Sequence, residues 1–133
     1  MTGIQTTGVR TAEHLGVIAQ RAKAAREEAF RQKCAPELDR VQRTLDSIEI
    51  EAYWEELQQV AAVEPNYHDR ATGRTPYRHL LLERSPDSDI LEHIKTHVIA
   101  PWIRDKLCNG IADHGFSTMQ VGPRLMLTWS VTL

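Results

Sequence analysis

The stretch that decides the fold of this chain is Leu125-Met126-Leu127-Thr128-Trp129-Ser130-Val131-Thr132-Leu133. Apolar side chains fill its odd-numbered positions, and the even-numbered positions after Met126 carry small polar side chains. A period of two over such a run is typical of a β-strand with one buried face. Gly122-Pro123 marks a turn before it, and residues 116–121 have strand composition. We therefore predict a C-terminal β-hairpin with strands at 116–121 and 124–132.

A helix is predicted immediately before the hairpin, over residues 86–114. Ser85-Pro86-Asp87 supplies a capping hydroxyl, a proline suited to the first helical position and an acidic side chain. Pro101 is expected to kink this helix. Gly115 is placed to end it, with Asn109-Gly110 as an earlier stop.

The region before this helix predicts one strand, one loop and a terminal tail. Leu80-Leu81-Leu82 indicates a short strand at 77–83, although so short an apolar run also suits the start of a helix. Residues 63–76 contain two prolines and a glycine and predict a long polar loop. Residues 1–10 are rich in threonine and glycine and predict a flexible tail.

Residues 11–62 show the three-four apolar spacing of amphipathic helices. Proline disfavours helix in the residue before it, so Ala35-Pro36 predicts a break between helices at 11–33 and 36–62. Residues 10–33 hold six basic and three acidic residues, whereas residues 37–56 hold two basic and seven acidic ones. We therefore expect a helical pair folded into an antiparallel hairpin. The alternative is one long helix, kinked at Pro36, that offers its seam to another chain.

The order α-α-β-α-β-β predicts an α+β fold, in which an N-terminal helical pair is followed by a small β-α-β-β sheet unit. The chain has 133 residues, so we expect one domain over 11–133, made of the 11–62 helical pair and a 77–133 sheet-plus-helix unit. A net charge of −2 does not indicate a general nucleic-acid or membrane binder. The sequence shows no signal peptide and no membrane-spanning run, so we expect a cytoplasmic protein, or one in a particle assembled in the cytoplasm.

His93 and His97 stand four residues apart on the predicted third helix, so both imidazoles could reach one metal ion. The acidic residue, Glu92, precedes the first histidine, so the metalloprotease pattern with its general base is absent. The pair lies beyond the edge of the apolar stripe. We interpret it as two surface histidines, keep a structural or adventitious metal as the alternative, and expect no cofactor.

Two other groups of residues are candidates for partner binding. Arg70, Arg74 and Arg78 belong to an arginine-rich loop and strand, residues 70–84, in which arginine alternates with tyrosine and histidine. That mixture suits phosphate contact and base stacking, although the arginines would equally pair with the acidic second helix. Tyr53-Trp54 is the second group, because adjacent residues point in different directions on a helix and one of them is expected to be exposed.

The sequence holds no serine nucleophile elbow, zinc-spaced cysteine pair, dinucleotide loop or calcium loop. We therefore expect no enzyme, but a non-enzymatic protein-interaction or assembly module that binds a protein partner or a second copy through its N-terminal helices. The alternative is a nucleic-acid-contacting accessory protein that uses residues 70–84. Compact chains of this style are common among small virus- and phage-encoded proteins, which suggests a viral or phage accessory or structural protein and assigns no residue roles.

Overall fold

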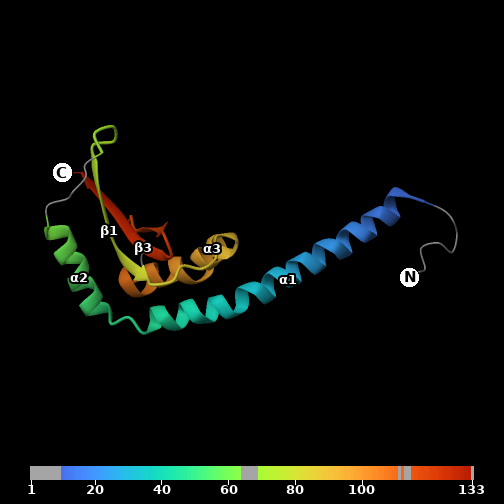
Figure 1. Ribbon diagram of the computed structural model, residues 1–133, viewed down its shortest axis with the longest axis horizontal. Helices are drawn as coiled ribbons and strands as arrows, with labels where there is room; N and C mark the ends of the chain where they lie inside the picture. The colour runs from blue at the N-terminus through green and yellow to red at the C-terminus, as the bar shows by residue number, and fades with distance from the viewer. Residues whose placement is uncertain (1–9, 64–68, 111, 113–114, 133) are drawn as a thin grey trace. The chain divides into compact units, whose positions relative to one another are not determined.

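The computed structural model describes residues 10–63, 69–110, 112 and 115–132. The predicted tail, residues 1–10, lies outside them except for Arg10. In chain order the elements are α1 (Ala12–Asp46), α2 (Ile50–Ala62), β1 (Arg74–Leu82), α3 (Ser88–Ile94), η2 (Lys95–Ile99), α4 (Ala100–Trp102), η3 (Ile103–Leu107), β2 (Ser117–Val121) and β3 (Arg124–Thr132), as Figure 1 shows. The chain divides into two units, Met1–Ala35 and Pro36–Leu133, and its α+β class is confirmed.

The three strands form one antiparallel sheet in the order β1-β3-β2. The C-terminal hairpin is confirmed, because β2 and β3 pair from Ser117↔Thr128 to Val121↔Arg124 around the Gly122-Pro123 turn. Gly122 has φ +58, a left-handed conformation that glycine adopts without steric cost. Each outer strand is antiparallel to β3, so β1 and β2 run in the same direction with β3 between them.

The first strand is longer than predicted and the loop before it is correspondingly shorter. β1 begins at Arg74 rather than at residue 77, so the end of the predicted 63–76 loop belongs to the sheet. A tight turn precedes the strand: Asp69 N–H donates to Arg74 O at 2.9 Å, and Gly73 N–H donates to Asp69 O at 2.8 Å. Residues 64–68 of the predicted loop lie outside the described residues.

One face of the sheet packs against helix and forms the core. Leu125 and Leu127 are fully buried, and Leu82 lies opposite Leu125 across the ladder. The helical segment 88–107 faces them, and Lys95 Nζ donates to the carbonyl of Thr118 in β2 at 3.4 Å. The buried apolar side chains of that segment are Ile90, Leu91, Ile94, Val98, Ile99, Trp102 and Ile103.

The third helix is not a regular α-helix, because two π-helical turns, η2 and η3, flank α4 and its Pro101. A π turn inserts one extra residue, which moves the buried stripe along by one position. Adjacent side chains therefore both enter the core, as in Val98-Ile99 and Trp102-Ile103. The helical segment ends at Leu107, well before Gly115, and Asn109 and Gly110 follow with positive φ. The predicted boundaries of 86 and 114 are thus wrong, and the earlier stop is the observed one.

The N-terminal helices divide at a different point from the predicted one. α1 continues through Pro36 to Asp46, so helices at 11–33 and 36–62 with a turn at Ala35-Pro36 are wrong. The break comes at residues 47–49, where Glu49 caps α2 by accepting the N–H of Ala52 at 2.6 Å. Of the two predictions for residues 11–62, the hairpin turning at Pro36 is excluded, and a helix running through the proline is observed.

α2 packs beside β1 within the C-terminal unit. Its buried side chains are Tyr53 and Leu57, and Tyr53 Oη donates to the carbonyl of Leu80 in β1 at 2.8 Å. The Tyr53 ring also contacts Trp102 edge-on, with ring centroids 6.2 Å apart. Among the described residues, no helix combines the length and the apolarity needed to cross a membrane.

We predict that Leu127→Ala destabilises the protein by about 2–5 kcal/mol, because it leaves a cavity beneath the central strand. Thr128→Ala, the neighbouring position on the opposite face of β3, should change the free energy of unfolding by less than about 1 kcal/mol. Urea denaturation of both variants measures this difference. Equal losses would show that the buried face of β3 does not carry the core.

Candidate functional site

The register of the sheet places the predicted arginines on its second face, away from the buried leucines. Arg74, Pro76, Arg78 and Leu80 of β1 alternate with the inward-facing residues. Their partners on β3 are Thr132, Ser130, Thr128 and Met126. Among the described strand residues on this open face none is acidic, and Arg124 adds a third basic side chain.

Arg74 lies across the sheet rather than projecting from it. Its guanidinium donates from Nε to Ser130 Oγ at 2.8 Å and from Nη2 to the carbonyl of Ser130 at 2.6 Å. A longer contact joins Nη1 to Thr132 Oγ1 at 3.5 Å. Arg78 is exposed four residues along the same strand, and Arg70 is exposed in the turn before it. The structure therefore brings Arg74 and Arg78 onto one surface, with Arg74 already bonded to β3.

Tyr53 and Trp54 separate as the helical geometry requires. Tyr53 is buried, and burial raises the pKa of its phenol, with the carboxylate of Glu56 adding to the effect. Trp54 is 43% exposed. Glu56 also contacts His79 Nε2 at 2.8 Å, which ties α2 to β1 a second time. Tyr53 is thus part of the core, and Trp54 alone of this pair is available to a partner.

His93 and His97 lie side by side on consecutive helical turns, with ring centroids 4.3 Å apart and the rings tilted by 50°. His93 is half-buried and His97 is exposed. Within the described residues, no group of three or more histidine, cysteine or acidic side chains is arranged to hold a metal ion. The two imidazoles supply two ligands, fewer than the three or four of a zinc site in proteins.

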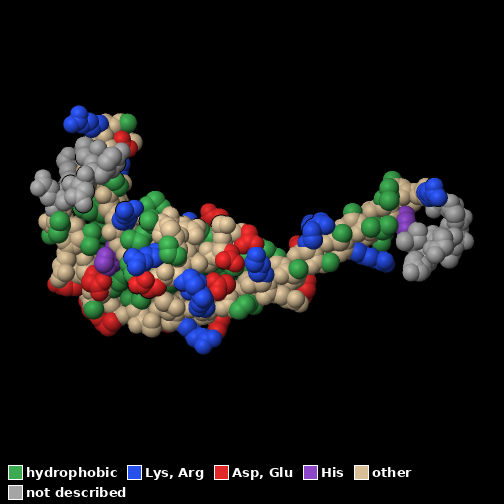
Figure 2. Space-filling view, viewed as in Figure 1, with side chains coloured by type: hydrophobic (Ala, Val, Ile, Leu, Met, Phe, Trp, Pro, Cys, Tyr) green, Lys and Arg blue, Asp and Glu red, His purple; other side chains and the backbone are tan. Residues whose placement is uncertain are grey.

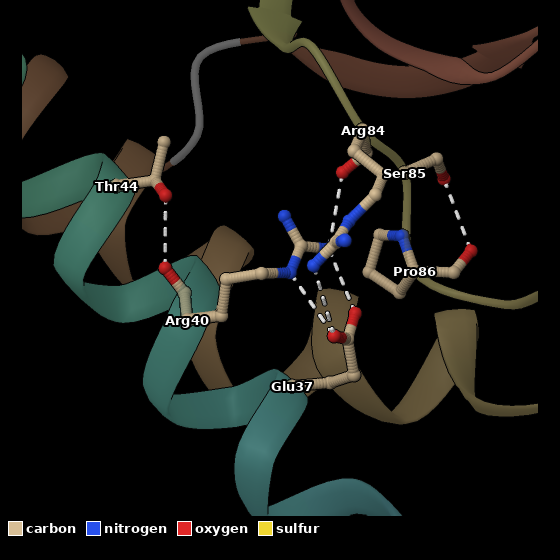
Figure 3. A network of polar contacts seen from close by, with 6 residues as sticks. All are labelled: Glu37, Arg40, Thr44, Arg84, Ser85 and Pro86. Atoms are coloured by element: carbon tan, nitrogen blue, oxygen red, sulfur yellow. Dashed lines mark hydrogen bonds and ion pairs between the residues drawn. The ribbon is translucent and has the colours of Figure 1, made fainter.

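A network of charged groups joins the C-terminal part of α1 to the connection between β1 and α3 (Figure 3). The carboxylate of Glu37 accepts from Arg40 Nε at 3.0 Å and from Nη2 at 2.7 Å. Arg40 Nη2 also donates to the carbonyl of Arg84 at 3.1 Å, and the Arg84 guanidinium approaches Glu37 at 3.7 Å. The hydrogen bond from Arg40, followed by the charges of Arg40 and Arg84, holds the pKa of Glu37 below its ordinary value.

A small hollow of about 270 Å³ opens between the helical segment and β2. Its apolar walls are Ile99, Ala100, Ile103 and Phe116, and Glu92 and Lys95 stand beside them. Sequence patterns do not reveal this hollow, because it depends on where the helix crosses the edge of the sheet. Arg124 was also missed, since only the sheet register brings it to the same face as Arg74.

Basic and acidic side chains are interspersed over the face of the C-terminal unit that Figure 2 shows. Many form local pairs, as between Arg43 and Asp39 and between Arg124 and Glu83. Exposed pairs of this kind contribute only about 0–1 kcal/mol each. The charge pattern on this view therefore does not single out a broad patch of one sign.

No protein-family model, curated protein or solved structure matches this chain.

The Glu37 network predicts a defined pH dependence of stability. Because the folded-state pKa of Glu37 lies below the ordinary 4.5, its stabilisation is complete above about pH 4.5 and is lost as the pH falls through the folded value. Glu37→Gln should cost roughly 1–2 kcal/mol at pH 7, and the difference from the wild type should shrink on acidification. Denaturation at pH 7 and at pH 3 measures this.

Glu28→Gln is the matched control, because Glu28 also pairs with an arginine three residues on, Arg31, but in an exposed position. It should change stability little at either pH. If Glu28→Gln reproduces the effect of Glu37→Gln, the half-buried network around Glu37 is not its cause.

Proposed function

We propose that this protein is a non-enzymatic interaction module whose N-terminal helical segment, residues 12–35 of α1, binds a helix of another protein. A large part of the segment's apolar surface is exposed. Leu15 is 67% exposed and Ile18 43%, and Ala25 and Ala29 are exposed as well. A helix with an exposed apolar stripe gains most of its stability by burying that stripe against another element.

The stripe is narrow and lined with small side chains. At about 100° per residue, Leu15, Ile18, Ala22, Ala25 and Ala29 fall within an arc of about 80°. The stripe ends at Ala29, because the positions three and four residues further on are Gln32 and Lys33. Alanine allows a second helix to approach closely. The seam spans about two heptads, which suits pairing with one partner helix rather than a long coiled coil.

Charges beside the stripe favour an acidic partner. Arg21 and Arg26 flank it on its two sides, at about 80° and about 60° from its centre. On the same helical wheel the acidic residues lie further away, Glu28 at about 100° and Glu13 and Glu27 at about 160° from the centre. Two copies of this segment would bring like charges together along the seam. A partner helix with acidic residues beside its apolar face would instead attract it, which would speed association and select the partner.

We expect Ile18→Asp to abolish partner binding and Val17→Asp to preserve it. The two side chains are almost equally exposed, at 43% and 44%, but Val17 points about 120° away from the centre of the stripe. Affinity capture from the source cells, followed by titration of the captured protein against each variant, makes the comparison.

The proposal fails if the wild-type chain captures no partner, or if the two variants bind equally well. Because both substitutions place the same acidic residue in the same helix, a general loss of helicity would affect them alike.

A second function is favoured by the open face of the sheet. Its described strand residues include Arg74, Arg78 and Arg124 and no acidic residue. Thr128 and Ser130 of β3 add hydroxyl side chains to the same face, beside Arg78 and Arg74 of β1. Hydroxyl and arginine side chains are common phosphate ligands. This surface supports the alternative of a nucleic-acid-contacting accessory protein. A viral or phage origin stays a prediction from the sequence.

A salt titration of single-stranded DNA and RNA binding tests that alternative. Arg78→Gln should weaken binding and lower the slope of log affinity against log salt concentration by about one, the effect of one lost phosphate contact. Arg104→Gln, which removes an exposed arginine from η3, should leave the slope unchanged. Absence of binding even at low ionic strength would exclude this function.

A further inference from the structure

We infer that β2 is a second association site, at which it pairs antiparallel with β2 of a second copy of this chain about a two-fold axis at Met119. The two sheets then become one continuous sheet. The inference does not depend on the proposed role of α1, because it concerns the opposite end of the chain and a different kind of contact.

The sheet has two edges, and the β1 edge is the better protected of the two against added strands. At the β1 edge, Pro76 lacks an N–H, and the ladder shifts register between Leu80 and Leu82. Arg74 and Arg78 add charge, and Tyr53 Oη already donates to the carbonyl of Leu80. Proline, irregular register and charge are the devices by which proteins prevent edge-to-edge pairing.

The β2 edge has none of these devices within the strand. Its sequence, Ser117-Thr118-Met119-Gln120-Val121, contains no charge, no proline and no glycine. Its pairing with β3 runs without a register shift. A neutral, regular edge strand is a ready template for another strand. It is also self-complementary, because an antiparallel copy brings no like charges face to face.

The open face of the sheet carries an apolar row that stops at this edge. Leu80 pairs with Met126, and Met126 pairs with Met119, so the three side chains cross the sheet from β1 to β2. Leu80 and Met126 are half-buried, while Met119 at the end of the row is 43% exposed. Pairing about Met119 would continue the row into the second copy and cover that methionine.

The polar backbone groups needed for this pairing are the ones that face outward. In an antiparallel pair, alternate residues direct their N–H and carbonyl groups toward the neighbouring strand. The carbonyl of Thr118 accepts from Lys95 Nζ at 3.4 Å, which places Thr118 in the outward-facing set, and Gln120, two residues on, faces outward as well. Because this contact is long and a carbonyl oxygen has two lone pairs, the same carbonyl can also accept the N–H of Gln120 from the second copy. With the axis at Met119, Thr118 of one copy pairs with Gln120 of the other, so both members of each pair are outward-facing.

The hollow beside β2 completes the surface. It is lined by Ile99, Ala100 and Ile103 of the helical segment, and it opens along the same edge. A second copy related by the two-fold axis presents the same apolar wall, so each hollow is covered by the helix of the other copy. Glu92 and Lys95 beside it carry opposite charges and therefore add no net repulsion.

The experiment measures dimerisation by sedimentation velocity over a range of concentrations, in an Ile18→Asp background that removes association through α1. We expect this protein to form a dimer. Met119→Lys should weaken the dimer by about tenfold or more, because two lysines then meet at the axis. Thr132→Lys, an exposed position on the same open face but at the far end of β3, is the matched control and should dimerise normally, because it lies outside both β2 and the hollow.

Charge exchange makes the register itself testable. Met119→Lys and Met119→Glu should each self-associate about tenfold or more weakly than the parent protein, and an equimolar mixture of the two should dimerise more strongly than either variant alone. The inference is overturned if the Ile18→Asp protein stays monomeric throughout, or if Met119→Lys and Thr132→Lys dimerise equally. A monomeric Ile18→Asp protein would leave the proposal for α1 intact, whereas capture of a partner that is insensitive to Ile18→Asp would remove that proposal alone.

Discussion

The pairing of β3 with both of its neighbours is the interaction on which the rest of the C-terminal unit depends. β3 lies between β1 and β2, and its Leu125 and Leu127 are completely buried beneath the helical segment. β1 is far from β3 in the sequence and pairs with no other strand of the sheet, so the sheet is complete only when β3 lies between the other two. The helix must pack on a face that β3 itself supplies. Core and sheet therefore form together, by contacts between distant parts of the sequence.

The hairpin is predictable from the sequence because its signals are local. A period of two and a two-residue turn fix both strands and their register without reference to the rest of the chain. β1 is different, because Arg74 and Pro76 look like loop residues. They belong to a strand because β3 provides hydroxyl and carbonyl acceptors for Arg74, and because Pro76 lies on an outer strand. Proline is tolerated there and not in a central strand.

The helix break at Pro36 was mispredicted for a related reason. A proline inside a helix loses one hydrogen bond and costs about 3 kcal/mol, which local rules treat as decisive. Here the residues that follow it compensate, since Val41 and Leu45 are fully buried and Glu37 binds Arg40 beside the Arg84 carbonyl. These tertiary contacts outweigh the single hydrogen bond that the helix loses at Pro36. Sequence rules also gave the separation of Tyr53 from Trp54, but only the packing shows that Tyr53 is the buried one.

The apolar side chains left outside the core are the observation on which the proposal of association with another chain rests. The unit Pro36–Leu133 has a well-filled interior of aliphatic residues around Trp102 and Tyr53. Yet Leu15, Ile18 and Met119 remain exposed on regular helix and strand, where a polar residue would have kept the same backbone. Leu15 and Ile18 belong to the apolar stripe of α1, and Met119 ends the apolar row that begins at Leu80. These three side chains are not buried by any of the described residues. Single exposed apolar residues are ordinary, but rows of them on rigid elements are typical of surfaces that meet another chain.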